Sequence, residues 1–221
     1  MKMTIATLLT AVLIAGMTPR YAATGPAKST CLVCKATKGE AAEEPVKAVR
    51  AYEGREYGFC SDKCAKAFKA DPAAYLPPVF PRRAPGFELE DLAGNAISTE
   101  SLRGKVVLLD FWATWCAPCR ESMPRLQAMH DRYAKQGFTV VGVSIDEGGS
   151  AKIRKFVASR KITYPVAVDS ETAPAWDSYR VKAVPAAYLI DREGNIVAQW
   201  TGTPASDKEL ELKLTELLGT D

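Results

Sequence analysis

Apolar residues from position 86 to the end of the chain alternate between strand-like runs and helix-like stripes. The run at 106–111 is apolar apart from Asp110, which predicts a buried strand. The stripe that follows it, Met123, Leu126, Met129 and Tyr133, predicts the inner face of a helix. Further strands are expected at 138–145, 164–168, 186–190 and 196–201, and further helices at 150–160, 173–179 and from a capping box at 206–209 onward. This alternation predicts an α/β domain with a central sheet flanked by helices.

Residues 28–76 follow a different pattern and predict a smaller unit. Short apolar segments at 48–52 and 57–60 flank a predicted turn, and Ser61 is suited to cap a helix at 62–70. The unit has few large apolar side chains, so burial alone gives it little stability. We therefore expect a compact α+β module that needs a covalent or metal staple.

The boundary between the two units is marked by a cluster of prolines, namely Pro77, Pro78, Pro81 and Pro85. Neither a helix nor a central strand tolerates that density of proline. The cluster predicts a semi-rigid linker at 77–85, which makes residues 86–221 the second domain.

The first 23 residues have the features of an export signal. Lys2 supplies a positive charge, and an apolar stretch follows at 5–17. That stretch is shorter than the roughly 20 residues of an ordinary membrane-spanning helix. We expect a signal peptide at 1–23 and a periplasmic or otherwise exported protein, with an uncleaved N-terminal anchor as the alternative.

Composition and charge exclude several classes of partner. The chain has 221 residues, of which 47% are hydrophobic and 25% charged, as in soluble globular proteins. Its formal net charge of +3 is small and dispersed along the sequence. We therefore expect no nucleic-acid partner, and no membrane partner beyond the N-terminal segment.

The six cysteines form three close pairs, and the last pair predicts redox chemistry. Cys116 and Cys119 follow a predicted buried strand and open a predicted helix. Unpaired backbone N–H groups and the helix dipole favour a thiolate at that position, so Cys116 is the expected attacking thiol. Cys119, one turn further on, is the expected resolving thiol. A structural disulfide or half of a zinc site is the alternative.

Residues 110–119, Asp-Phe-Trp-Ala-Thr-Trp-Cys-Ala-Pro-Cys, resemble the active-site strand and turn of thioredoxins. The span from Gly86 to the C-terminus resembles the TlpA/ResA-like branch of exported thiol–disulfide oxidoreductases. This resemblance implies a thioredoxin fold, with a central mixed sheet flanked by helices. It also implies a redox-active Cys116–Cys119 disulfide, a cis peptide bond before Pro185 that faces it, and substrate binding by Trp115, Val184 and Pro185.

Asp110 is the third predicted catalytic residue. It lies within the apolar strand where thioredoxins keep a buried carboxylate, and burial would raise its pKa. It could then accept the proton of Cys119. The alternative is an exposed strand-end aspartate. Many TlpA/ResA-like proteins have a glutamate three residues after the second cysteine, but this chain has Ser122 there and Glu121 one position earlier.

The first four cysteines, Cys31, Cys34, Cys60 and Cys64, have the spacing of a metal site. One pair is three residues apart and the other four, so the thiols can converge on one tetrahedral ion. Together with the Asp-Pro-Ala-Ala-Tyr-Leu segment at 71–76, they resemble the YHS/TRASH-type metal-binding module. Thiolate ligands favour zinc or copper(I). Two disulfides are the alternative, which an oxidising compartment would permit.

The chain therefore predicts an exported thiol–disulfide oxidoreductase that acts on protein thiols and disulfides. The resemblance suggests a reductant that is recharged by a membrane electron donor and acts on cytochrome maturation or metal-site thiols. The appended module suggests a link to copper handling. One alternative is a peroxiredoxin-like peroxidase, although Ala113 and Leu109 replace the residues that such an enzyme needs. The other is a non-catalytic metal carrier or metallochaperone.

Overall fold

The computed structural model describes residues 28–39, 43–202 and 207–219. The expected signal segment at 1–23 and Ser206, the first residue of the expected capping box, lie outside these residues. The chain divides into two compact units, with the boundary between Pro78 and Val79. Within the described residues, no helix has the length and apolar content needed to cross a membrane.

The first unit is a small α+β module. Its elements are β1 (Lys28–Thr30), α1 (Leu32–Lys38), β2 (Glu43–Pro45), β3 (Ala48–Tyr52), β4 (Arg55–Phe59), α2 (Asp62–Ala70) and the 3-10 turn η1 (Pro72–Ala74). β1 pairs with β2, and β3 pairs with β4, both antiparallel. The predicted cap is present, since the Ser61 hydroxyl accepts a hydrogen bond from the Cys64 backbone N–H at 3.2 Å.

The core of this module is small and centred on one ring. Its buried side chains are Cys31, Val33, Phe59, Ala65 and Phe68. The rings of Tyr52, Tyr57, Phe59 and Tyr75 surround Phe68, with centroid separations of 4.9–6.4 Å. So few buried groups give a domain of this size only marginal stability, which agrees with the staple predicted from its composition.

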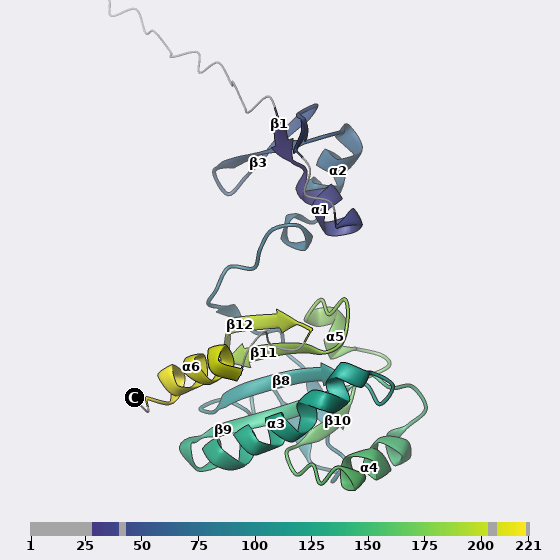
Figure 1. The fold of residues 1–221 in the computed structure, drawn as a ribbon, viewed down its shortest axis with the longest axis vertical. Helices are drawn as coiled ribbons and strands as arrows, with labels where there is room; N and C mark the ends of the chain where they lie inside the picture. Colours follow the sequence, from purple (N-terminus) through teal and green to yellow (C-terminus); the bar gives the residue numbers. More distant parts are fainter. Residues whose placement is uncertain (1–27, 40–42, 203–206, 220–221) are drawn as a thin grey trace, which may run out of the picture. The chain divides into compact units, whose positions relative to one another are not determined.

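The second unit is built on a six-stranded sheet (Figure 1). Its elements are β5 (Arg82–Arg83), β6 (Glu88–Glu90), β7 (Ala96–Ser98), β8 (Val106–Trp112), α3 (Ala117–Tyr133), η2 (Ala134–Gln136), β9 (Phe138–Ser144), α4 (Ser150–Ser159), β10 (Val166–Val168), α5 (Ala175–Ser178), β11 (Ala186–Ile190), β12 (Asn195–Thr201) and α6 (Asp207–Leu218). The strand order is β10-β9-β8-β11-β12-β5. β8, β9 and β10 run parallel, and β11, β12 and β5 join antiparallel. The sheet is therefore mixed, and the predicted thioredoxin fold is confirmed.

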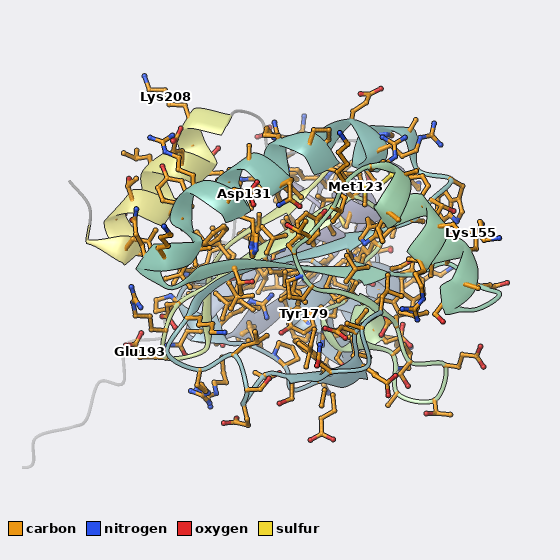
Figure 2. All side chains as sticks on the ribbon, turned by 90° about the horizontal axis from the view of Figure 1, so that it is seen from below. Met123, Asp131, Lys155, Tyr179, Glu193 and Lys208 are labelled. Carbon is orange, nitrogen blue, oxygen red and sulfur yellow. A yellow bond between two sulfur atoms is a disulfide. The ribbon has the colours of Figure 1, made fainter. Side chains whose placement is uncertain are left out.

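Two hydrophobic cores cover the two faces of this sheet. One contains Met123 of α3, Ile153 of α4 and Leu210 of α6. The other contains Tyr179, together with the β6–β7 hairpin and α5. In Figure 2, Met123 and Lys208 of α6 lie on one side of the sheet and Tyr179 on the other. All seven residues of β8 are buried, because this strand lies between both cores.

The linker expected at 77–85 is shorter in the structure. Arg82 and Arg83 form β5, which pairs with Asn195 and Ile196 of β12. The next residue, Ala84, is buried in the core of the second unit. The prolines are tolerated because β5 is a two-residue edge strand that lies between them. The sheet domain consequently begins before Gly86.

The central ring of the module provides a test of its independence from the second unit. Phe68→Ala should destabilise the module by about 3–5 kcal/mol and unfold it, because so little else is buried there. All four tryptophans lie in the second unit, so their fluorescence should not change. Hydrogen exchange at 48–70, recorded together with tryptophan fluorescence, checks both expectations.

Val49→Ala is the matched control, since Val49 is 40% exposed and its truncation should cost little. A tryptophan signal that collapses together with the module in the Phe68→Ala variant would contradict the independence of the two units.

Candidate functional site

The junction between β8 and α3 carries the predicted redox pair. Cys116 is the N-cap residue of α3, and its Sγ accepts a hydrogen bond from the backbone N–H of Cys119 at 3.2 Å. Cys116 and Cys119 are joined by a disulfide. Pro118 lies in the first turn, where the helix leaves backbone N–H groups without intrahelical partners and proline costs no hydrogen bond. The sulfur of Cys116 therefore lies at the positive end of a 17-residue helix.

The two cysteine residues differ slightly in exposure. Cys116 is 5% exposed and Cys119 only 1%, while the neighbouring Trp115 is 64% exposed. An approaching substrate consequently meets Trp115 and Cys116 first. This difference supports the prediction that Cys116 attacks and Cys119 resolves. The exposure of Trp115 is consistent with its predicted contact with a substrate.

Asp146 fixes the turn before Cys116, and it was not among the residues predicted from the sequence. Its carboxylate accepts hydrogen bonds from the Thr114 backbone N–H at 2.7 Å, the Thr114 hydroxyl at 2.5 Å and the Ser144 hydroxyl at 2.9 Å. Burial acts to raise the pKa of Asp146, but these bonds and one from Lys152 hold it below its ordinary value. The available signal was an aspartate directly after the predicted strand at 138–145.

Asp110 is buried in the middle of β8, as predicted, and 3% exposed. In the sheet it lies opposite Ala187 of β11 and Gly142 of β9. Side chains alternate along a strand, so Asp110 points to the same face as its neighbours Leu108 and Trp112, which belong to the α3 core. Its side chain therefore faces the core that contains both active-site cysteines.

The environment of Asp110 changes its acidity. Desolvation by burial raises the pKa of its carboxyl to about 7, although the charge of Arg125 acts in the opposite direction. Its Oδ2 atom has no hydrogen-bond partner within the described part of the chain. The group can therefore take up and release a proton near neutral pH, which suits a general base.

Ser122 stands at the position, three residues after Cys119, where many TlpA/ResA-like proteins have a glutamate. Ser122 is buried, and its hydroxyl donates to the Cys119 carbonyl at 2.9 Å. Glu121 is exposed, because a shift of one residue along a helix turns a side chain by about 100°. Within the described residues, the buried carboxyl groups are those of Asp110 and Asp146.

The peptide bond between Val184 and Pro185 is cis, as the resemblance implied. Pro185 is buried directly before β11, the strand that pairs with β8. Val184 is partly exposed and packs against the core that contains Cys116 and Cys119. The structure thus brings Val184, Pro185 and the cysteine pair to one region of the second unit.

A groove of about 720 Å³ lies beside Trp115, where the loops after β9 and β10 meet. Trp115 and Trp176 contribute its aromatic lining, and Glu147 and Glu171 add exposed carboxylates. The Asp169 carboxylate shapes the second loop by accepting the backbone N–H groups of residues 175 and 176, at 2.8 and 2.9 Å. The groove offers room for a peptide segment beside Trp115, the residue before Cys116.

The other four cysteines converge in the first unit. Their sulfur atoms all lie within 4.8 Å of one another, and all four are free thiols. The Sγ separations are 3.5 Å for Cys34–Cys60, 3.8 Å for Cys60–Cys64 and 3.9 Å for Cys34–Cys64. A tetrahedral ion with metal–sulfur bonds of about 2.3 Å requires sulfurs roughly 3.8 Å apart. The residues present therefore fit a four-thiolate metal site.

Helix starts position these thiols as well. Cys31 is the N-cap residue of α1 and Cys34 lies in its first turn. Cys60 precedes the cap of α2 and Cys64 lies in the first turn of that helix. The dipole of each helix favours a thiolate there, whereas the neighbouring Cys34 sulfur and burial act in the opposite direction and raise the pKa of Cys60.

Comparison with known proteins identifies two families along the chain. Residues 81–199 match the AhpC/TSA family, and residues 47–79 match the YHS domain. The YHS match includes Cys60 and Cys64 but begins after Cys31 and Cys34. The resemblance predicted from the sequence is confirmed in both parts.

The relatives of this chain carry the names of thiol–disulfide oxidoreductases or thioredoxin-like proteins. The chain is 33% identical over 127 residues to a thiol-disulfide oxidoreductase ResA of Bacillus cereus, covering 58% of this chain and 72% of the relative. It is 36% identical over 134 residues to the thioredoxin-like protein YneN of Bacillus subtilis, covering 60% and 77%. A crystal structure described as a putative thiol:disulfide interchange protein DsbE from Chlorobium tepidum is 37% identical, with a TM-score of 0.58, and the match covers 63% of this chain and 97% of that chain.

The raised pKa of Asp110 makes stability depend on pH in a defined direction. Its ordinary pKa of 3.8 applies to the unfolded chain and about 7 to the folded one, so the folded state binds this proton more tightly. The stability it contributes is full below pH 3.8 and is lost as pH rises through 7, up to about 4 kcal/mol. The Asp110→Asn variant should lack this loss.

The check is the free energy of unfolding of both oxidised proteins, measured from about pH 4 to about pH 8.5. The Asp110→Asn variant should gain stability relative to the parent protein as pH rises. A difference between the two proteins that stays constant across this range would show that Asp110 is not buried as a proton-binding group.

Proposed function

The chain belongs to the AhpC/TSA family and is a thiol–disulfide oxidoreductase, and on this basis we propose that Cys116 and Cys119 exchange a dithiol for a disulfide with protein substrates. One observation carries the proposal: a disulfide whose first cysteine caps a helix at the end of a fully buried strand. This arrangement favours a thiolate where a substrate can reach it and keeps the second sulfur within bonding distance.

The reaction proceeds in two displacements from the reduced enzyme. The Cys116 thiolate attacks a substrate disulfide, forms a mixed disulfide and releases the first substrate sulfur as a thiolate. Cys119 then gives its proton to Asp110 and attacks the Sγ of Cys116. The second substrate sulfur leaves, the Cys116–Cys119 disulfide closes, and two electrons have passed to the substrate.

Four residues support the first displacement without changing bonds in that step. The Cys119 N–H, which lies 3.2 Å from the sulfur of Cys116, stabilises the attacking anion. Trp115 and the backbone of Val184 flank the path of the substrate, with Pro185 behind them. A peptide that pairs with Val184 and occupies the groove beside Trp115 would bring its disulfide to Cys116.

We also propose a direction of electron transfer, partners and a location for this protein. The branch that this chain resembles consists of exported proteins, so we assign it to the periplasm or an equivalent exported location, with residues 1–23 as its signal. In that setting it acts as a reductant recharged by a membrane electron donor. The cysteine module, as a holder of zinc or copper(I), links it to metal handling or cytochrome maturation.

The catalytic assignment predicts a graded series of activities in the reduction of insulin by dithiothreitol. Cys116→Ser should give no rate above background, because no attacking sulfur remains. Asp110→Asn should slow the exchange about 100-fold near neutral pH, since Cys119 loses its base.

Glu121→Gln is the matched control for Asp110→Asn, because Glu121 is an exposed carboxylate on the same helix as the cysteines. Its activity should equal that of the parent protein. Rapid turnover of hydrogen peroxide by the parent protein, without insulin reduction, would replace this proposal by the peroxidase alternative.

The module predicts metal binding by the reduced chain. Protein purified under reducing conditions should bind about one Cd²⁺ ion, with thiolate charge-transfer absorption in the ultraviolet. Cys60→Ser should weaken this binding strongly, while the Cys116→Ser/Cys119→Ser double variant should retain it. A parent protein that binds Cd²⁺ no better than its Cys60→Ser variant would count against a four-thiolate site.

A further inference from the structure

Two of the metal-site sulfurs, those of Cys34 and Cys60, lie close together. The Sγ atoms of Cys34 and Cys60 lie 3.5 Å apart, closer than the 3.8 and 3.9 Å that separate the Cys64 sulfur from them. A disulfide of about 2.05 Å requires the two sulfur atoms to approach by roughly 1.5 Å. Both are free thiols in the structure. The pair can therefore exist as two thiols or as one disulfide.

Accessibility distinguishes this pair from the most buried member of the cluster. Cys31 is 2% exposed, so neither an oxidant nor an attacking thiolate reaches it readily. Cys34, Cys60 and Cys64 are each half-buried, and Cys34 and Cys60 come from different segments of the module. A two-electron oxidant, such as a low-molecular-weight disulfide, can consequently convert this pair.

Oxidation of this pair would abolish the metal site. A metal ion needs its thiol ligands reduced and deprotonated, and a disulfide between Cys34 and Cys60 leaves only Cys31 and Cys64. Two thiolates do not complete the tetrahedral set that the sulfur separations fit. The metal-binding capacity of the module thus depends on a reductant for this pair.

The same chain contains a site that supplies that chemistry. Resting on the proposed function, we propose that the oxidised Cys34–Cys60 pair is itself a substrate of the Cys116–Cys119 dithiol. The protein then restores its own metal-binding thiols. The module is thereby a client of the oxidoreductase as well as a metal holder.

The electrons and atoms balance in two steps. The Cys116 thiolate attacks Sγ of Cys60, the Cys34–Cys60 bond breaks, and Cys34 leaves as a thiolate that takes a proton. Cys119 then attacks Cys116, Cys60 leaves, and the Cys116–Cys119 disulfide forms. One disulfide is lost and one gained, and an external dithiol donor recharges the active site.

The test follows transfer between two full-length chains that differ in isotope. The acceptor is ¹⁵N-labelled Cys116→Ser/Cys119→Ser protein oxidised with diamide, and the donor is unlabelled, fully reduced parent protein. Peptide mapping by mass spectrometry should first show a Cys34–Cys60 link in the acceptor. After mixing, that link should disappear as a Cys116–Cys119 link appears in the donor, and Cd²⁺ binding by the acceptor should return.

The matched donor is reduced Cys116→Ser protein, which has the same module thiols and lacks the attacking sulfur. Transfer from the parent donor should be at least about 10-fold faster than from this variant, since only the parent has the Cys116 sulfur from which Cys119 can release the substrate. A Cys119→Ser donor should accumulate Cys116 joined to Cys60 or Cys34 of the labelled chain. Recovery of Cd²⁺ binding after excess dithiothreitol confirms that the acceptor is folded.

The outcomes separate this inference from the function on which it rests. If the parent donor reduces insulin but reduces the acceptor no faster than the Cys116→Ser donor does, the inference is wrong and the proposed function stands. If it reduces neither substrate, the proposed function fails. An acceptor map without a Cys34–Cys60 link overturns the inference at its first step.

Discussion

The structure depends on one junction, where a strand buried on both faces ends at a cysteine that caps a helix. All seven residues of β8 are buried between two cores, so the strand cannot slide without exposing one core or the other. The turn that follows is held by the Asp146 carboxylate through the backbone and side chain of Thr114. The position of Cys116 at the start of α3 is therefore set by the packing of the whole sheet and does not rely on the loop alone.

The two units use the same physical device for different chemistry. In each, cysteines lie at the start of a helix, where the unpaired N–H groups and the dipole favour a thiolate. In the second unit, the Cys116 sulfur has only the Cys119 sulfur as its partner. This pair therefore suits thiol–disulfide exchange. In the module, two helix starts bring four sulfurs within 4.8 Å, which suits a metal ion. The number of converging thiols decides which chemistry each helix start supports.

Local sequence patterns predicted most of the helices and strands and the redox pair. They did not predict strand pairing or hydrogen bonds between residues that are distant in the sequence. The run that became β8, the Ser61 cap and the buried Asp110 are properties of a few neighbouring residues. β5 exists only because Arg82 and Arg83 meet the distant strand β12, so proline density alone indicated a linker. Asp146 was missed for the same reason, since its partner Thr114 is 32 residues distant. The convergence of the four module thiols was indicated by spacing, but their separations required the structure.

The most direct test is the reactivity of Cys116 in the fully reduced protein. We predict that iodoacetamide, at a pH of about 6.5, modifies Cys116 at least about 10-fold faster than it modifies glutathione, with peptide mapping to identify the modified residue. Such a result would show a sulfur held as an anion by the start of α3. A rate equal to that of glutathione would contradict the central claim, because the helix would then confer no special reactivity on this thiol.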